Sequence, residues 1–158
     1  MRVSAKTDYA LQAMTELAAA PPDDPVKAEH IANAQDIPLK FLLAIMNELK
    51  RARLVRSQRG AEGGFVLARP AAEITLADVI RAIDGPLANI HDTSVSGLAY
   101  SGPAEHLRDV WMAVRASLRA VLEVVTLEDL ATGRLPRAVR VMAESYEAET
   151  KERYPANR

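Results

Sequence analysis

Two helices separated by a tight turn and followed at once by a glycine-rich hairpin are predicted in the first half of the chain. This order restricts the fold more than any other feature of the sequence. The turn is Asp36-Ile37-Pro38, in which proline is well placed to begin the second of the two helices. Gly60 and Gly63 mark a hairpin between two short runs of strand-forming residues. The expected helices and strands cover residues 26–35, 38–50, 54–57 and 64–68.

The helix that begins at Pro38 has two different faces. Apolar residues recur at positions i, i+3, i+4 and i+7, which is the spacing of a buried helix face. They are Leu42, Ile45, Met46 and Leu49. The opposite face is mixed in character and carries Lys40, Leu43, Ala44, Asn47 and Lys50. One face is therefore expected in the core, and the other is available to a partner.

Further helices are expected on both sides of this unit. Ser4 is a suitable N-cap, and Thr75 and Thr126 each precede an acidic residue three positions later, as in a capping box. Residues 87–103 show no consistent period and are expected to form a loop. The expected helices cover residues 4–20, 76–84, 107–125 and 127–133, with weaker helical character from 136 to 154.

The strongest periodic segment is a single apolar seam of about five helical turns. Its members are Leu107, Val110, Trp111, Val114, Leu118, Val121, Leu122 and Val125. A helix of this length lies outside the N-terminal core, and one small domain can hardly cover it. Pairing with the same helix of a second subunit would bury the seam symmetrically, so we expect a homodimer.

Composition excludes several classes of protein. The chain has no cysteine, so disulfides, zinc sites with thiolate ligands, cysteine nucleophiles and thiolate-bound iron–sulfur clusters are excluded. Neither a glycine-rich phosphate loop nor a nucleophile-elbow motif occurs, and His30, His91 and His106 are far apart in sequence, so we expect no catalytic residues and no enzyme. No segment resembles a signal peptide or a membrane span, so a cytoplasmic protein with no membrane partner is expected.

Positive charge is concentrated around the hairpin. Residues 38–69 contain seven Lys or Arg against two Glu, a net charge of +5, whereas the whole chain carries −1. The second helix of such a pair fits the major groove of duplex DNA, and the hairpin lies over the adjacent backbone. Arg59 at the hairpin tip is able to enter a narrow minor groove, whose negative potential attracts arginine.

We therefore predict a mainly α protein with a small β wing: a winged helix-turn-helix plus a long C-terminal dimerisation helix. The predicted divisions are a DNA-binding domain, a loop as a sensor region, the dimerisation helix with the short helix after it, and a tail. They cover residues 1–86, 87–104, 105–133 and 134–158.

Several segments resemble the Rrf2 (Rrf-two) family of bacterial regulators, which includes the iron–sulfur regulator IscR, the nitric-oxide sensor NsrR and the cysteine-metabolism repressor CymR. The resemblance covers residues 1 to 133 and is most specific in the hairpin; the matching segments are 1–11, 31–42, 54–68, 74–85 and 109–111. It implies a homodimeric transcription regulator, such as a repressor, with crossed long helices and a two-fold symmetric operator. By position, the DNA contacts it implies are Lys40, Phe41, Ala44, Ser57, Arg59 and Gly60, with phosphate contacts from Lys6 or Tyr9.

The sequence departs from the family in the loop before the long helix. Many relatives hold an iron–sulfur cluster there with three cysteines, and this chain has none, so we expect no cofactor. His91, Asp92, Glu105 and His106 are potential ligands of another metal, but such groups in a loop are more often solvated, and no metal site is predicted. The signal would instead be a small molecule, a partner protein or none, with a ligand entering between the loop and the long helices.

One alternative is a winged-helix dimer that has lost its affinity for DNA and binds proteins. Leu43 favours it, because a side chain that faces DNA is expected to be polar. A metal-dependent sensor is a second alternative. Salt dependence separates the first from DNA binding, since only phosphate contacts weaken steeply with added salt.

Overall fold

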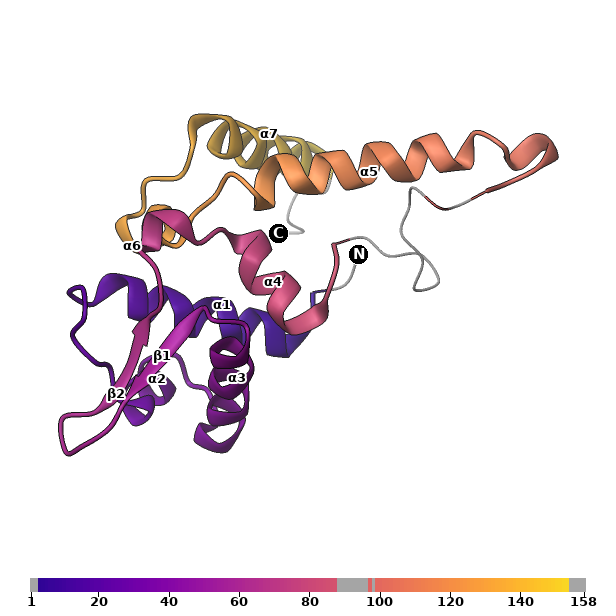
Figure 1. The fold of residues 1–158 in the computed structure, drawn as a ribbon. Coiled ribbons are helices and arrows are strands. Elements are labelled where there is room, and N and C mark those ends of the chain that lie inside the picture. Colours follow the sequence, from indigo (N-terminus) through magenta and orange to yellow (C-terminus); the bar gives the residue numbers. More distant parts are fainter. Residues whose placement is uncertain (1–2, 88–96, 98, 154–158) are drawn as a thin grey trace.

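The computed structural model describes residues 3–87, 97 and 99–153, and the fold within them is mainly helical with one small antiparallel sheet (Figure 1). In the N-terminal half the elements are α1 (Ala5–Ala19), α2 (Ala28–Ala34), α3 (Leu39–Arg51), β1 (Val55–Gln58), β2 (Gly64–Leu67), the 3-10 turn η1 (Ala71–Glu73) and α4 (Leu76–Asp84). The C-terminal half contains the 3-10 turn η3 (Gly102–Ala104), α5 (Leu107–Leu122), α6 (Leu127–Thr132) and α7 (Arg137–Arg153). This arrangement confirms the predicted fold class.

The core lies among α1, α2, α3 and the root of the hairpin. The four predicted core residues of α3 are all fully buried: Leu42, Ile45, Met46 and Leu49. They pack with Met14 of α1 and Ile31 of α2 in one apolar cluster. The two strands pair in register, Val55 opposite Leu67 and Ser57 opposite Phe65. The apolar stripe of α3 thus fixes which of its faces remains outside.

Two predicted helix boundaries differ from the structure. Helix α3 begins at Leu39, because Pro38 has an extended ψ of 122° and serves as the N-cap. Helix α5 ends at Leu122, so the prediction that Val125 continues the dimerisation seam is wrong. Val125 is 2% exposed, and its carbonyl oxygen accepts a hydrogen bond from the Leu76 amide of α4. It belongs to the core of its own chain.

Helix α6 returns the chain to the winged unit. Both predicted capping boxes are present, Thr75 with Asp78 and Thr126 with Asp129. The two threonines also form a β-bridge with each other, and Leu127 is fully buried in the main core. Helix α6, which the sequence grouped with the long helix, thus packs through Leu127 on the core of the winged unit.

Helix α5 projects from the winged unit as a long arm (Figure 1). Near its C-terminal end, Leu122 packs on a small cluster around Ile80 of α4 and Leu87. The Glu123 carboxylate accepts hydrogen bonds from Arg81 of α4 and, at 2.9 Å, from Arg119. These two bonds, of which the one from Arg81 has the larger effect, hold the pKa of the Glu123 carboxyl below its usual value. Among the described residues, these contacts hold the C-terminal end of the arm against α4. In the described part of the chain, no helix is long and apolar enough to cross a membrane.

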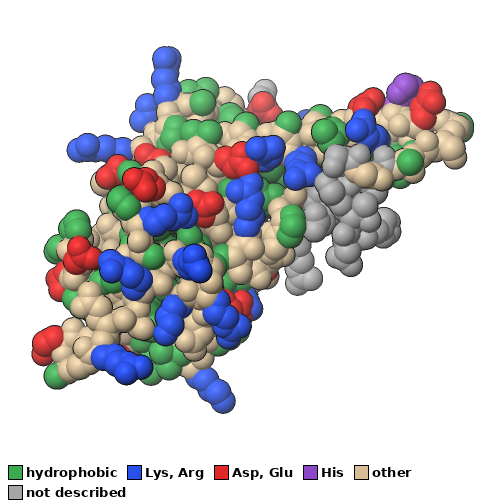
Figure 2. Space-filling model, viewed as in Figure 1, with side chains coloured by type: hydrophobic (Ala, Val, Ile, Leu, Met, Phe, Trp, Pro, Cys, Tyr) green, Lys and Arg blue, Asp and Glu red, His purple; other side chains and the backbone are tan. Residues whose placement is uncertain are grey.

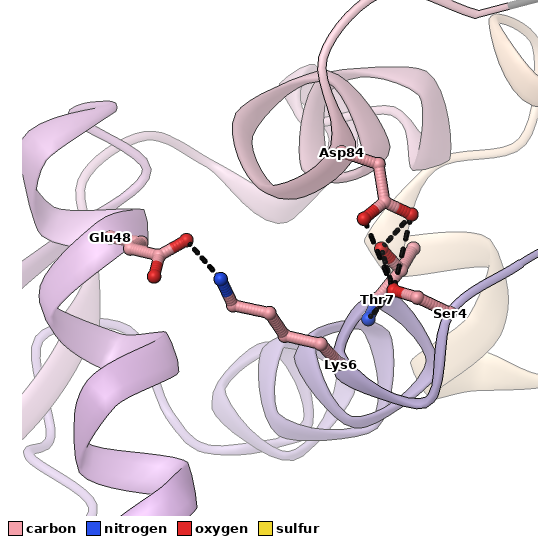
Figure 3. Close-up of polar contacts among 5 residues, drawn as sticks. All are labelled: Ser4, Lys6, Thr7, Glu48 and Asp84. Atoms are coloured by element: carbon pink, nitrogen blue, oxygen red, sulfur yellow. Dashed lines mark hydrogen bonds and ion pairs between the residues drawn. The ribbon is translucent and has the colours of Figure 1, made fainter.

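A small polar cluster joins the start of α1 to the end of α4 (Figure 3). The Thr7 hydroxyl, which is fully buried, donates a hydrogen bond of 2.5 Å to Asp84, and the Ser4 hydroxyl lies 3.1 Å from the same carboxylate. Ser4 also caps α1 by accepting from the Thr7 amide at 3.1 Å. These contacts connect residues that are about 80 positions apart in sequence.

We expect Thr7→Val to lower the free energy of unfolding by about 1–2 kcal/mol, because it removes a buried donor to a carboxylate without changing the side-chain shape. Thr15→Val is the matched control, since the Thr15 hydroxyl donates only to Leu11 of its own helix. Urea denaturation followed by circular dichroism measures both. Equal stabilities of the two variants would contradict a structural role for the Asp84 cluster.

Candidate nucleic-acid interface

The outer face of α3 is open to solvent. Lys40, Leu43, Ala44, Asn47 and Lys50 are all exposed, whereas Leu42, Ile45, Met46 and Leu49 of the same helix are buried. Their spacing places them on one side of the helix, opposite the core stripe. This side of α3 therefore presents a continuous stripe of side chains, two of them cationic, to a partner.

The main contact of Phe41 is with α1, and it is not part of the outer face of α3. Its ring lies 5.8 Å from that of Tyr9 in α1 at an interplanar angle of 82°, an edge-to-face contact. Phe41 remains 39% exposed and Tyr9 is half-buried. The pair fixes α3 against α1, so both predicted contact residues border the face that the lysines occupy.

Lys6 is held by an ion pair that the sequence did not predict. Its Nζ lies 2.8 Å from Oε2 of Glu48 on α3, and the two side chains are 34% and 29% exposed (Figure 3). A phosphate at this position would have to share or replace that carboxylate. Lys6 thus joins α1 to α3, and its predicted phosphate contact stays a prediction.

The tip of the hairpin is built from glycines for steric reasons. Gly60 has φ of 110°, a conformation that other residues rarely adopt. A Cβ on Gly63 would lie 2.4 Å from the Gln58 carbonyl oxygen, and one on Gly64 would lie 2.5 Å from that of Val26. These close approaches leave Arg59 exposed at the end of the hairpin.

Helix α3 and the hairpin are joined at their bases. Lys50 Nζ donates a hydrogen bond of 3.2 Å to the Ser57 hydroxyl on β1. An open groove of about 610 Å³ runs beside this contact and is lined by Lys50, Arg53, Val55, Arg56, Ser57, Ala68 and Arg69. The predicted contact residues Lys40, Ser57, Arg59 and Gly60 therefore lie on two elements that hold one another in place.

The groove contains cations that our assignment of individual contacts omitted. Arg53 has a positive φ of 59°, which turns the chain from α3 into β1. Arg56 pairs with Asp23 at 3.0 Å, and Arg69 lies 3.5 Å from Asp78. The clustering of positive charge between residues 38 and 69 was the sequence signal that could have added these three arginines to the predicted DNA contacts. Figure 2 shows blue side chains gathered over the lower part of the molecule, where α3 and the hairpin lie.

The predicted dimerisation residues lie on α5 except for Val125. Leu107, Val110 and Val114 are 37%, 53% and 41% exposed, and the other four are partly buried: Trp111, Leu118, Val121 and Leu122. They lie on the same apolar seam as Leu122 but nearer the N-terminal end of the helix, away from the α4 contact along its axis. This exposed part of the seam is the outer side of the arm, and its apolar side chains remain available to a partner.

No metal site is evident among the described residues, which contain no group of three or more potential ligands. Glu105 and His106 lie next to each other, 3.3 Å apart, in contact with solvent. His91 and Asp92 lie outside the described residues. His30 is exposed on α2.

The chain is similar to known regulators over almost its whole length. Residues 3–133 match the Rrf2 family, described as iron-dependent transcriptional regulators. All 158 residues align at 51% identity with a Mycobacterium tuberculosis protein named as an HTH-type transcriptional regulator, covering 100% of this chain and 98% of that protein. The HTH-type transcriptional regulator CymR of Bacillus subtilis is 36% identical over 132 residues, 84% of this chain and 91% of CymR.

Solved structures agree with this assignment. The structure of CymR, the global cysteine regulator of B. subtilis, has a TM-score of 0.72 at 33% identity and covers 84% of this chain and 97% of its own. These relatives are regulators and not enzymes, as the sequence predicted. The chain therefore belongs to the Rrf2 family of DNA-binding, winged-helix transcription regulators.

Proposed function

We propose that this protein acts as a homodimer on a two-fold symmetric DNA site, with α3 in the major groove and Arg59 in the adjacent minor groove. The observation that carries the proposal is the concentration of exposed cations on α3 and the hairpin, two elements joined by the Lys50–Ser57 hydrogen bond. A rigid pair of this kind can place a helix and a hairpin on one duplex at the same time.

The homodimer is supported by the outer side of α5. Val110 and Val114 lie one turn apart with about half of their surface in water, and Leu107 continues the same side. An apolar face on a projecting helix marks an interaction site, and the same helix of a second copy is its self-complementary partner. Two winged units would then contact two half-sites.

We further propose that regulation proceeds without an iron–sulfur cluster. The family is described as iron-dependent, yet this chain has no cysteine to supply the thiolates that hold such clusters. The residues present therefore do not fit the cluster. A pocket of about 300 Å³ between α4 and α5, lined by Arg81, Pro86, Leu87, Arg115 and Arg119, offers a site for a small-molecule effector beside the pairing of Arg81 and Arg119 with Glu123.

The defining experiment is selection of bound fragments from a pool of random duplex DNA, followed by titration of the recovered site at 50 and 200 mM salt. We expect a two-fold symmetric sequence and an affinity that falls steeply with salt, since each neutralised phosphate adds about 0.9 to the logarithmic slope. A protein-binding dimer would enrich no sequence. Weak, sequence-independent binding would contradict the proposed function.

A charge variant of α3 tests the placement of that helix. Lys40→Ala is expected to lower the salt slope by about 1 for each half-site, because one phosphate contact is lost. Lys151→Ala on α7, where Lys151 pairs with Glu147 at 3.6 Å, is the matched control and should leave the slope unchanged. An unchanged slope for Lys40→Ala would remove this residue from the interface.

A further inference from the structure

The middle of the exposed stripe on α3 is apolar. Leu43 is 40% exposed and Ala44 beside it is also exposed, and they lie between Lys40 and Asn47. A single leucine on a protein surface needs no explanation by itself. Its position does, because Leu43 lies in the N-terminal half of α3, and the N-terminal residues of a recognition helix are those that contact base edges.

The apolar group by which those base edges are recognised is the C5-methyl group of thymine. The amino, carbonyl and ring-nitrogen groups there donate or accept hydrogen bonds, and an aliphatic side chain pressed against one of them would leave it unsatisfied. Leu43 is therefore complementary to thymine and unfavourable over guanine or cytosine. The small side chain of Ala44 allows the helix to approach closely at the same level.

Asn47 supplies the matching polar contact. It follows Leu43 by four residues, so the two side chains are neighbours on the helix surface, about 6 Å apart at their Cβ atoms. An asparagine amide pairs with adenine by donating to N7 and accepting from the N6 amino group. Among the described residues, the exposed Asn47 side chain has no hydrogen-bond partner that would compete with this role.

We propose, on the basis of the function proposed above, that Leu43 contacts thymine methyl groups and that Asn47 reads a neighbouring adenine. The half-site then contains adjacent A·T pairs beneath the middle of α3, flanked by the contacts of Lys40 and the hairpin. Leu43, which taken alone favours a protein partner, becomes a determinant of DNA sequence.

The test replaces each thymine of the selected site in turn by deoxyuridine, which pairs with adenine but lacks the methyl group. Wild-type affinity is expected to fall about fourfold for each half-site at the contacted position, equivalent to about 0.8 kcal/mol, the value of one buried methylene group. Leu43→Ala should bind the thymine site about as weakly as wild type binds the uridine site, and should not distinguish the two. Val141→Ala on α7, where Val141 is 46% exposed, is the control for truncating an exposed aliphatic side chain.

Asn47 is tested with 7-deazaadenine, which lacks the N7 acceptor. We expect this base to weaken wild-type binding at one position of the half-site and to leave Asn47→Ala unaffected. Equal binding of wild type to thymine and uridine duplexes, or equal uridine sensitivity in wild type and Leu43→Ala, would overturn the assignment of Leu43. Either result would leave the proposed DNA-binding function intact. Failure to enrich any DNA site would instead contradict both the proposed function and the base contacts of Leu43 and Asn47.

Discussion

A chain that carries Val110→Glu and Val114→Glu is expected to be a monomer and to bind its DNA site two to three orders of magnitude more weakly than wild type. Both valines lie on the outer side of α5, 53% and 41% exposed in the single chain. Two carboxylates on each subunit would have to be buried without partners if the arms paired. A monomer binds each half-site separately. It therefore loses the gain in affinity that two linked binding units provide, which is typically a factor of 10² to 10⁴.

The matched control is Ala116→Glu with Ala120→Glu, which places the same charges at the same spacing on the exposed opposite side of α5. Sedimentation equilibrium gives the oligomeric state, and titration of the selected duplex gives the affinity. The control is expected to remain dimeric. A dimeric valine variant would show that the outer side of α5 is not the interface, and a monomer with full affinity would show that dimerisation is not needed for binding.

Removal of the hairpin arginine is the second change for which we expect a large effect. Arg59→Ala should weaken binding on the order of a hundredfold, because a dimer loses two charged contacts of roughly 1.5 kcal/mol each. Arg59 is exposed beside a turn in which Gly60 has a positive φ and Gly63 leaves no room for a side chain. The glycines of the turn therefore set where the proposed Arg59 contact lies on the hairpin.

Flanking sequence reveals what Arg59 reads. A-tracts narrow the minor groove and strengthen its negative potential, so the loss caused by Arg59→Ala should be larger on A-tract flanks than on G·C flanks. Arg134→Ala, which removes an exposed cation between α6 and α7, should leave affinity unchanged on both. An equal loss on the two flanks would indicate a phosphate contact in place of minor-groove insertion.

Local patterns in the sequence predicted most of the elements correctly. The four apolar residues of α3, the caps at Ser4, Thr75 and Thr126, and the two strands each depend on neighbours within a few positions. Such signals do not require knowledge of how the chain returns on itself. They sufficed to predict the winged helix-turn-helix and the position of its outer face.

Apart from the start of α3, the incorrect or missing predictions discussed above involve distant contacts. Val125 continues the helical period of the seam, but Leu76 captures its carbonyl and the core covers its side chain. The pairing of Lys6 with Glu48 and the burial of Leu127 depend on how closely α1 approaches α3 and α6. Periodicity identifies a face that will be covered, but it does not identify the residues that cover it.

The attachment of α5 at one end gives it the mechanics of a lever. Its sixteen residues span about 24 Å, with Glu123 and Val125 fixed to the winged unit and Val110 near the far end. A rotation of about 8° at the fixed end displaces the far end by about 3.4 Å, the rise of one base pair. In the proposed dimer, a signal that tilts the arm by this small angle would therefore change the separation of the two winged units by a whole step of the double helix.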